Sequence, residues 1–269
     1  SYCLGLQNGD YYNFTKSTLD DDAYEFTLNM GMMDAIHRLA PHDYHMPGTA
    51  SGVWKLGATN HNEPLTQTNV TSRKQSSQGV LSIPPVILDG TIWVSRSGRK
   101  LIKVAYQLEN DRYMDIDMTK LASHITLGST LALSGIKWLA FQQEPVPILW
   151  AIRIDGQLLG MTYEVKENVF AWFRVVTDGL FESVAVISKD NAEDQVWVTV
   201  KRTVNTETRR YVEYFMPHEL FGVIGDSFFV HSGLTYDSTL TSTISGLYHL
   251  EGKVVDVLGD GLAQTQKTV

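Results

Sequence analysis

The stretch ILWAIRIDGQLLGMTY, residues 148–163, carries the clearest signal of fold class in this chain. Two apolar runs flank Asp155-Gly156, and an Asp-Gly pair in that setting is a strong hairpin signal, because a type I′ turn needs positive φ at both central residues. A two-residue turn gives one ribbon face that is almost wholly apolar. It predicts four pairs: Ile154 with Gln157, Ile152 with Leu159, Trp150 with Met161, and Ile148 with Tyr163.

The same aromatic hairpin pattern recurs along the chain. In TIWVSRSGRKLIKVAY, residues 91–106, a Leu follows the Trp by eight residues and a Tyr by thirteen, and residues 150–163 repeat that spacing. VWVTVKRTVNTETRRY, residues 196–211, has its Trp and Tyr across a longer loop, and SGVWKLGA, residues 51–58, supplies a fourth Trp. The structural repeat positions are therefore Trp54, Trp93, Trp150 and Trp197, with Tyr106, Tyr163 and Tyr211.

The tryptophan spacing favours a β-propeller. Successive Trp positions are 39, 57 and 47 residues apart, which suits four-stranded blades better than solenoid repeats. We therefore predict an all-β chain, a propeller-like array of antiparallel sheets with five to six blades. The alternative is a β-sandwich with recurrent Trp hairpins. Gly98 follows its Trp by five residues and Gly156 by six, so the two hairpins differ in register unless one strand carries a bulge.

The intervening segments also read mainly as strands. An Asp-Gly turn is expected at 177–183 and a long exposed excursion at 57–79. The best helix candidate is 117–125, with Asp117 or Thr119 as N-cap and Leu121 and Ile125 on one face. Further strands are expected at 168–176, 182–188 and 226–234, and a weaker helix at 218–225.

Composition narrows the class of protein. The single Cys3 excludes an internal disulfide. No window approaches the ~20 apolar residues of a membrane span, so we expect none. A net charge of −8 argues against a nucleic-acid-binding module. The two densest basic stretches, 95–100 and 201–210, fall on predicted hairpin turns and are expected to be solvated loops.

Residue patterns give little support for catalysis or metal binding. His42-x-x-His45 could hold a metal with two imidazoles, but zinc sites need three or four ligands. The acidic stretch 19–25 lacks the order of a calcium loop. We therefore predict no enzyme activity, no metal site and no cofactor. The remaining candidates have local explanations as scattered histidines or acids at or beside hairpin turns: His37, His61, Asp155, Glu164, Asp178 and Glu182.

Several stretches resemble the nozzle-type tail tubular proteins (tail tubular protein B-like) of short-tailed bacteriophages. They extend, in the family's order, from about Gly9 to Gly261. The stretches are DYYNF, DMTKLASHI, PILWAIRIDGQLLGMTYE, AWFRVVTDGLFESVAVI, VWVTVKRTVN with RYVEYF, and GLYHLEGKVVDVLGDG. Residues 31–46 fit only loosely. The better-known nozzle proteins carry a β-propeller, which agrees with the repeat spacing.

The resemblance implies a structural role in the virion. Subunits ring the tail axis below the portal and form part of the DNA-ejection channel, in contact with other tail or portal-side proteins. The chain would be a homo-oligomer, with a hexamer as the expected ring, assembled in the bacterial cytoplasm. The alternative function is a carbohydrate-binding or glycan-hydrolysing phage tail protein, which would use exposed tryptophans and an acidic cleft.

The sequence predicts two domains. Residues 1–245 would form the propeller-like domain. Residues 246–269 would begin a second small β domain that is mostly missing from this sequence, with nothing to pair with the strand in KVVDVLGDG.

At −8 per subunit, lumen-facing loops are expected to be neutral or acidic and to let DNA pass without specific binding, while the basic stretches point outward or toward neighbouring subunits.

Overall fold

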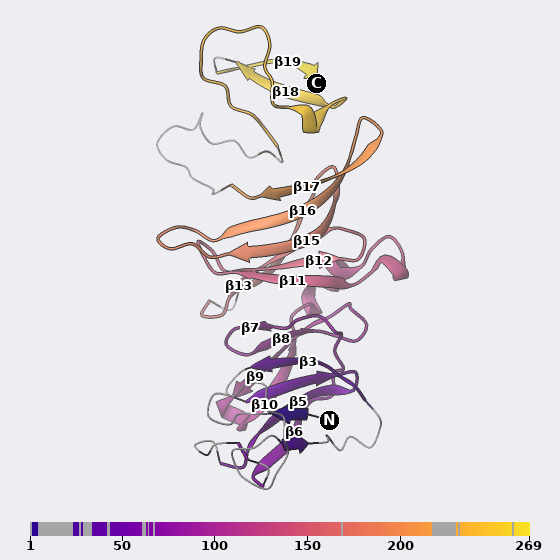
Figure 1. Ribbon diagram of the computed structural model, residues 1–269, viewed down its shortest axis with the longest axis vertical. Helices are drawn as coiled ribbons and strands as arrows, with labels where there is room; N and C mark the ends of the chain where they lie inside the picture. Colours follow the sequence, from indigo (N-terminus) through magenta and orange to yellow (C-terminus); the bar gives the residue numbers. More distant parts are fainter. Residues whose placement is uncertain are drawn as a thin grey trace. The chain divides into compact units, whose positions relative to one another are not determined.

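The computed structural model describes residues 2–4, 24–26, 28, 34–41, 44–60, 63, 65–66, 68–167, 169–216, 230, 232–259 and 261–269. The chain is mostly β-strand, so the all-β prediction is confirmed (Figure 1). It divides into two compact units, Ser1–Leu139 and Ala140–Val269. The helix expected at 218–225 and most of the strand expected at 226–234 lie outside the described residues.

Among its described residues, the first unit contains two four-stranded antiparallel meanders, in which each strand pairs with the next along the chain. One meander consists of β3 (Ile36–Pro41), β4 (His45–Thr49), β5 (Gly52–Ala58) and β6 (Val70–Ser76). The other consists of β7 (Val86–Ile87), β8 (Thr91–Val94), β9 (Leu101–Gln107) and β10 (Arg112–Asp117). The short strands β1 (Tyr2–Leu4) and β2 (Tyr24–Phe26) pair separately.

The two meanders of the first unit pack face to face around Trp93. Its side chain is fully buried, in a cluster that includes Met46 and Val53 from one sheet and Ile102 from the other. The indole occupies space that a side chain at Gly48 would fill, because a Cβ built there would lie 2.5 Å from Trp93 Cζ3. Glycine therefore lets the two sheets approach closely enough to enclose the large ring.

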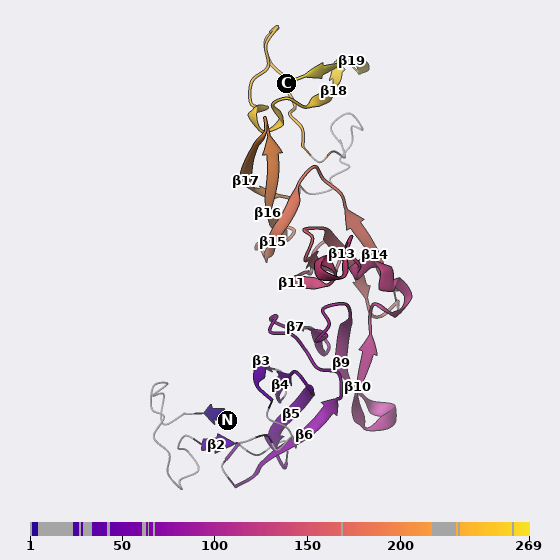
Figure 2. The same ribbon diagram turned by 90° about the vertical axis from the view of Figure 1, so that its right-hand side faces the viewer.

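The second unit repeats the meander arrangement. One sheet contains β11 (Ile136–Gln142), which crosses the boundary between the units, β12 (Ile148–Arg153), β13 (Leu158–Glu164) and β14 (Val169–Val175). The next contains β15 (Leu180–Ile187), β16 (Gln195–Val204) and β17 (Glu207–Tyr214), which lie side by side in both views (Figure 1, Figure 2). A two-stranded hairpin follows, formed by β18 (Val254–Gly259) and β19 (Leu262–Thr268).

The two larger sheets of the second unit pack around Trp150. Its indole is 5% exposed and contacts Phe173 edge to face, with ring centroids 5.7 Å apart, and Phe215 in a stacked arrangement at 5.4 Å. The remaining side chains of this core come from both sheets: Ile152, Leu158, Phe181, Val184, Val196, Val198 and Val200. Each unit thus encloses one tryptophan between two sheets.

The hairpin at 148–163 forms, but its predicted register is wrong by one residue. Trp150 pairs with Gly160 rather than Met161, and Ile152 pairs with Leu158. Arg153 donates its backbone N–H to the carbonyl of Gln157 in the last hydrogen bond of the hairpin, so the loop has three residues, with Gly156 at φ +87°. This geometry is a three-residue loop with glycine in the left-handed position rather than a type I′ turn.

The hairpin at 91–106 has a different loop. Ser95 donates its backbone N–H to the carbonyl of Lys100, which leaves four loop residues, and Trp93 pairs with Ile102. The unequal glycine spacing in the sequence therefore reflects two loop lengths.

The short helix expected at 117–125 forms, as a 3-10 helix at Lys120–Thr126 with non-helical angles at Ala122, and two other local expectations are corrected. Because of that kink, Leu121 is 99% exposed whereas Ile125 is buried, so the two side chains do not share a face. The excursion expected at 57–79 contains β6, which pairs with β5. Further short 3-10 turns lie at Leu108–Asn110, Leu131–Leu133 and Tyr248–Leu250.

The C-terminal strand is also paired, contrary to expectation. β18 pairs with β19 of the same chain, and every side chain of β19 is exposed. The predicted domain boundary near residue 245 stays a prediction. The propeller-like arrangement is not confirmed, because face-to-face packing of successive meanders is common to propeller blades and to sandwiches.

Candidate functional site

The repeat tryptophans are packing residues rather than exposed platforms. Trp54, Trp93 and Trp150 are 9%, 0% and 5% exposed, and Trp197 is half-buried. A tryptophan that stacks on a sugar ring must present one face to solvent. Trp54, Trp93 and Trp150 therefore offer no such face.

The two central tryptophans differ from the other two because their indole N–H groups have hydrogen-bond acceptors. Trp93 donates its indole N–H to Thr91 Oγ1 at 2.8 Å, and Trp150 donates to Gln142 Oε1 at 2.9 Å. Within the described part of the chain, the buried Nε1 atoms of Trp54 and Trp197 have no acceptor. Of the four repeat tryptophans, Trp93 and Trp150 are thus the two whose indole N–H groups are hydrogen-bonded.

The repeat tyrosines lie in different environments. Tyr106 is 48% exposed, donates its hydroxyl to Asp111, and lies on the Trp93 face of its sheet. Tyr163 is 5% exposed and lies on the face opposite Trp150. Trp150 pairs with Gly160, and Tyr163 follows Gly160 by three residues, an odd number, so its side chain points to the other face of the sheet. The hydroxyl of Tyr211 is buried, with no partner among the described residues. Equal spacing in the sequence therefore does not place the tyrosines on one face.

Three of the four candidate carboxylates are paired with cations. Asp155 accepts bidentate hydrogen bonds from Arg153 at 2.6 and 2.7 Å, and both side chains are largely buried. Burial opposes ionisation of Asp155, but hydrogen bonds from Arg153 and the Gln157 amide outweigh it, so the pKa of Asp155 is lowered. Asp178 pairs with Lys253 and Glu182 with Arg210. Glu164 ends β13, opposite Val169.

The candidate histidines do not form a metal centre within the described residues. His37 Nδ1 lies 2.8 Å from the carbonyl oxygen of Val80, which gives this imidazole a local structural partner. His45 lies at the start of β4. His42, His61 and most of the acidic stretch 19–25 lie outside the described residues.

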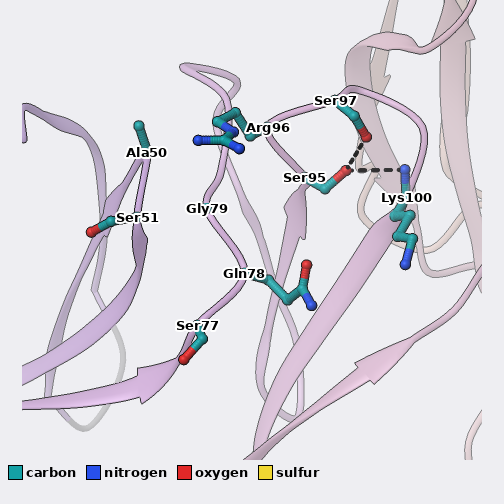
Figure 3. Close-up of a pocket in the computed structure, with 9 residues that line it drawn as sticks. All are labelled: Ala50, Ser51, Ser77, Gln78, Gly79, Ser95, Arg96, Ser97 and Lys100. Atoms are coloured by element: carbon teal, nitrogen blue, oxygen red, sulfur yellow. Dashed lines mark hydrogen bonds between the residues drawn. The ribbon is translucent and has the colours of Figure 1, made fainter.

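A polar hollow of about 330 Å³ lies in the first unit, between three loops (Figure 3). We call it the Arg96 hollow. Its walls are the β4–β5 turn at 50–51, the segment 77–79 after β6, and the β8–β9 loop at 95–100. Sequence reasoning identified the last of these only as an exposed turn. The clustering of Arg96, Arg99 and Lys100 in an acidic chain was the signal available to find it.

Backbone hydrogen bonds connect the loops that form the Arg96 hollow. Arg96 donates its backbone N–H to the carbonyl of Gly79 at 2.7 Å, and Val80 donates to Thr49 at 2.8 Å. A Cβ built at Gly79 would lie 1.8 Å from the carbonyl oxygen of Ala50, so only glycine permits this approach. The three loops therefore hold a fixed arrangement.

Within the described residues, no helix combines the length and the hydropathy that crossing a membrane requires. Neither a protein-family model nor a curated protein sequence matches the chain.

Proposed function

We propose that this chain is a non-enzymatic structural subunit of the tail nozzle of a short-tailed bacteriophage. Its copies form a closed ring, with a hexamer as the expected assembly, through which DNA leaves the virion. The ring contacts other tail or portal-side proteins and assembles in the host cytoplasm. The proposal rests on the resemblance of several stretches to that family and on one structural observation.

That observation is the succession of antiparallel meanders that pack face to face around a buried tryptophan. Trp93 and Trp150 each lie on the second strand of a four-stranded sheet, and each is enclosed between two sheets. Large aromatic side chains buried in this way stabilise a rigid framework. Such a framework suits the wall of a channel, which must hold its shape while DNA passes.

Exposed apolar side chains support an assembling role. On the face of β15–β17 opposite the Trp150 core, the side chains of Ile187, Val212 and Tyr214 are 51%, 70% and 44% exposed. Grouped apolar side chains of this kind are typical of surfaces that another protein covers.

Charge supports the passage of DNA without specific binding. Six copies at −8 each would carry about −48 in total. Acidic side chains facing the axis would repel phosphates, whereas Lys and Arg contacts would add affinity and slow the DNA.

Labelled particles test the virion role directly. An antibody to this chain should decorate the tail of the phage in electron micrographs, at the level of the nozzle. Labelling of the capsid alone, or none on tailed particles, would overturn the proposal.

The purified chain should also show no measurable affinity for duplex DNA at ~150 mM salt. Tight binding there would contradict free passage.

Assembly is tested separately by native mass spectrometry of the complex released from particles. A closed ring, with six copies expected, supports the proposed subunit role. A glycan array distinguishes the carbohydrate-binding alternative, for which the buried Trp93 and Trp150 offer no stacking face. Saturable binding to one glycan class would favour that alternative.

A further inference from the structure

The segment between β10 and β11 contains a closed loop with exposed leucines, residues 127–133. Gly135 donates its backbone N–H to the carbonyl of Thr126 at 2.8 Å, and Gly128 donates its own to the Ser134 hydroxyl at 2.9 Å. These hydrogen bonds tie the two ends of the loop together. All of its residues except Gly128 are exposed, so the loop projects from the first unit. We call it the leucine loop.

The leucine loop presents aliphatic side chains to solvent although its neck is buried. Leu127, Leu131 and Leu133 are 45%, 78% and 39% exposed, whereas Thr126 and Ser134 at the two ends are buried. Apolar surface left in water carries a free-energy cost that contact with an apolar phase removes. A group of exposed leucines on a loop with a fixed neck therefore indicates an interaction surface.

The neck of the leucine loop is bonded to the basic stretch 95–100. The Thr126 hydroxyl donates to the carbonyl of Arg99 at 3.0 Å, and Ile136 donates its backbone N–H to the carbonyl of Gly98 at 2.8 Å. These two bonds hold both ends of the leucine loop against the same turn. The exposed Arg99 therefore lies beside the neck of the leucine loop.

The charge around the leucine loop is positive, although the whole chain carries −8. Residues 118–143 contain two lysines, one of them the exposed Lys120, and no Asp or Glu. Asp117, just before this segment, lies 3.4 Å from Lys100 and is compensated by it. The guanidinium of Arg99 has no acidic partner in the described part of the chain. The surface that carries the leucines thus combines apolar side chains with uncompensated cations.

We propose that the leucine loop inserts into the surface of a membrane that contains anionic lipids. Leucine side chains gain free energy on entering the boundary between headgroups and acyl chains, and cations such as Arg99 and Lys120 are attracted by anionic headgroups. A fluid lipid layer accepts a projecting loop without a preformed pocket, whereas a protein partner must supply one. The inference concerns contact with a lipid surface and does not depend on the channel role proposed above.

Vesicle flotation of the full chain tests the proposal. The chain should float with vesicles of phosphatidylglycerol and phosphatidylethanolamine at millimolar lipid, and much less with vesicles of phosphatidylcholine. Binding of one copy should be weak, because even a single myristoyl chain gives only marginal membrane binding. Raising the salt concentration to ~1 M should reduce flotation several-fold, because salt screens the attraction between the cations and the headgroups.

Single substitutions separate the apolar and the charged contributions. Leu131→Ser should weaken vesicle binding about tenfold, because it removes the most exposed leucine of the loop. Arg99→Gln should weaken binding about fivefold, and only to anionic vesicles. The matched control is Leu108→Ser, since Leu108 is 84% exposed in another 3-10 turn of the first unit but is followed by Glu109. This control should leave binding unchanged, and all three variants should melt at the wild-type temperature, because the substituted side chains are exposed.

A fluorophore on the loop reports insertion itself. In a Cys3→Ser background, Leu131→Cys labelled with an environment-sensitive dye should shift its emission to the blue when anionic vesicles are added. Leu108→Cys labelled in the same way should not.

Four results would overturn the proposal: no flotation of the wild type, equal flotation on anionic and neutral vesicles, equal flotation of wild type and Leu131→Ser, or the same blue shift at both dye positions. Loss of oligomer assembly in Leu131→Ser, with no vesicle binding by the wild type, would assign the leucine loop to a protein contact and would also overturn it. Labelling of the virion is not affected by any of these results, so failure here is distinct from failure of the channel role.

Discussion

Phe173 occupies the space in which a side chain at Gly160 would lie. A Cβ built at Gly160 would come within 2.2 Å of Phe173 Cζ, an atom of the ring that contacts Trp150 edge to face. Trp150, Gly160 and Phe173 face one another across three neighbouring strands. Glycine in the middle strand therefore allows the two aromatic rings on either side to touch, as in aromatic coverage of a strand glycine.

Gly160→Ala should destabilise the second unit by about 1–3 kcal/mol, because the added methyl forces the Phe173 ring away from Trp150. Chemical denaturation measures the change. Gly259→Ala is the control, since its nearest neighbour would be the flexible Gln264 side chain at 3.4 Å, and its effect should stay within about 0.5 kcal/mol. In a double-mutant cycle, Phe173→Leu should reduce the cost of Gly160→Ala. Strict additivity would contradict the contact.

Trp150→Ala should cost about 3–5 kcal/mol, because it leaves a large cavity and removes the partner of Gln142. Trp138→Ala is the comparison, since Trp138 is 44% exposed and should cost less than about 1 kcal/mol. Both are read from thermal or denaturant unfolding. An unchanged melting temperature for Trp150→Ala would mean that the indole is not enclosed.

The Arg153–Asp155 pair should make stability depend on acid pH. The pKa of Asp155 is lowered, so its contribution is complete above its ordinary value of 3.8 and is lost as pH falls through the lowered folded-state pKa. Asp155→Asn should cost roughly 3 kcal/mol at pH 7, because it removes the charged carboxylate that accepts two hydrogen bonds from the largely buried Arg153 guanidinium. Its stability should fall less steeply than that of the wild type below about pH 4.

The control for that pair is Glu207→Gln, which breaks a pair of the same spacing whose side chains are 51% and 68% exposed. It should cost at most about 1 kcal/mol, because solvent screens exposed pairs. Equal losses for the two variants would show that burial does not strengthen the Arg153–Asp155 pair.

Limited digestion should cut the chain near the predicted boundary before it cuts the hairpins. Residues 232–246 are exposed and contain no strand. Chymotrypsin has accessible sites there, since Tyr236, Leu240 and Tyr248 are 46%, 106% and 71% exposed. Trypsin serves as a contrast, because no Lys or Arg lies between Arg210 and Lys253. Protection of 246–269 equal to that of the core would count against a boundary there.

Local patterns in the amino-acid sequence were sufficient to predict the all-β class and the hairpins at 91–106 and 148–163. Alternating apolar residues around Asp155-Gly156 are sufficient for a hairpin, because strand period and turn chemistry are local properties. The burial of Trp93 and Trp150 on apolar strands followed from the same local patterns. The paired state of β19 did not, because the polar LAQTQKTV stretch carries a weak strand pattern.

Strand register, and the residues that lie next to one another in space, depend instead on contacts between segments that are distant in the chain. One residue more or less in a loop moves every following side chain to the other face of a strand, so Tyr106 and Tyr163 diverge although both follow their Trp by thirteen residues. The Arg96 hollow likewise joins loops far apart in the chain, at 50–51, 77–79 and 95–100. Its assembly depends on the close approach of Gly79 to Ala50, which is a contact between two loops and not a property of either loop alone.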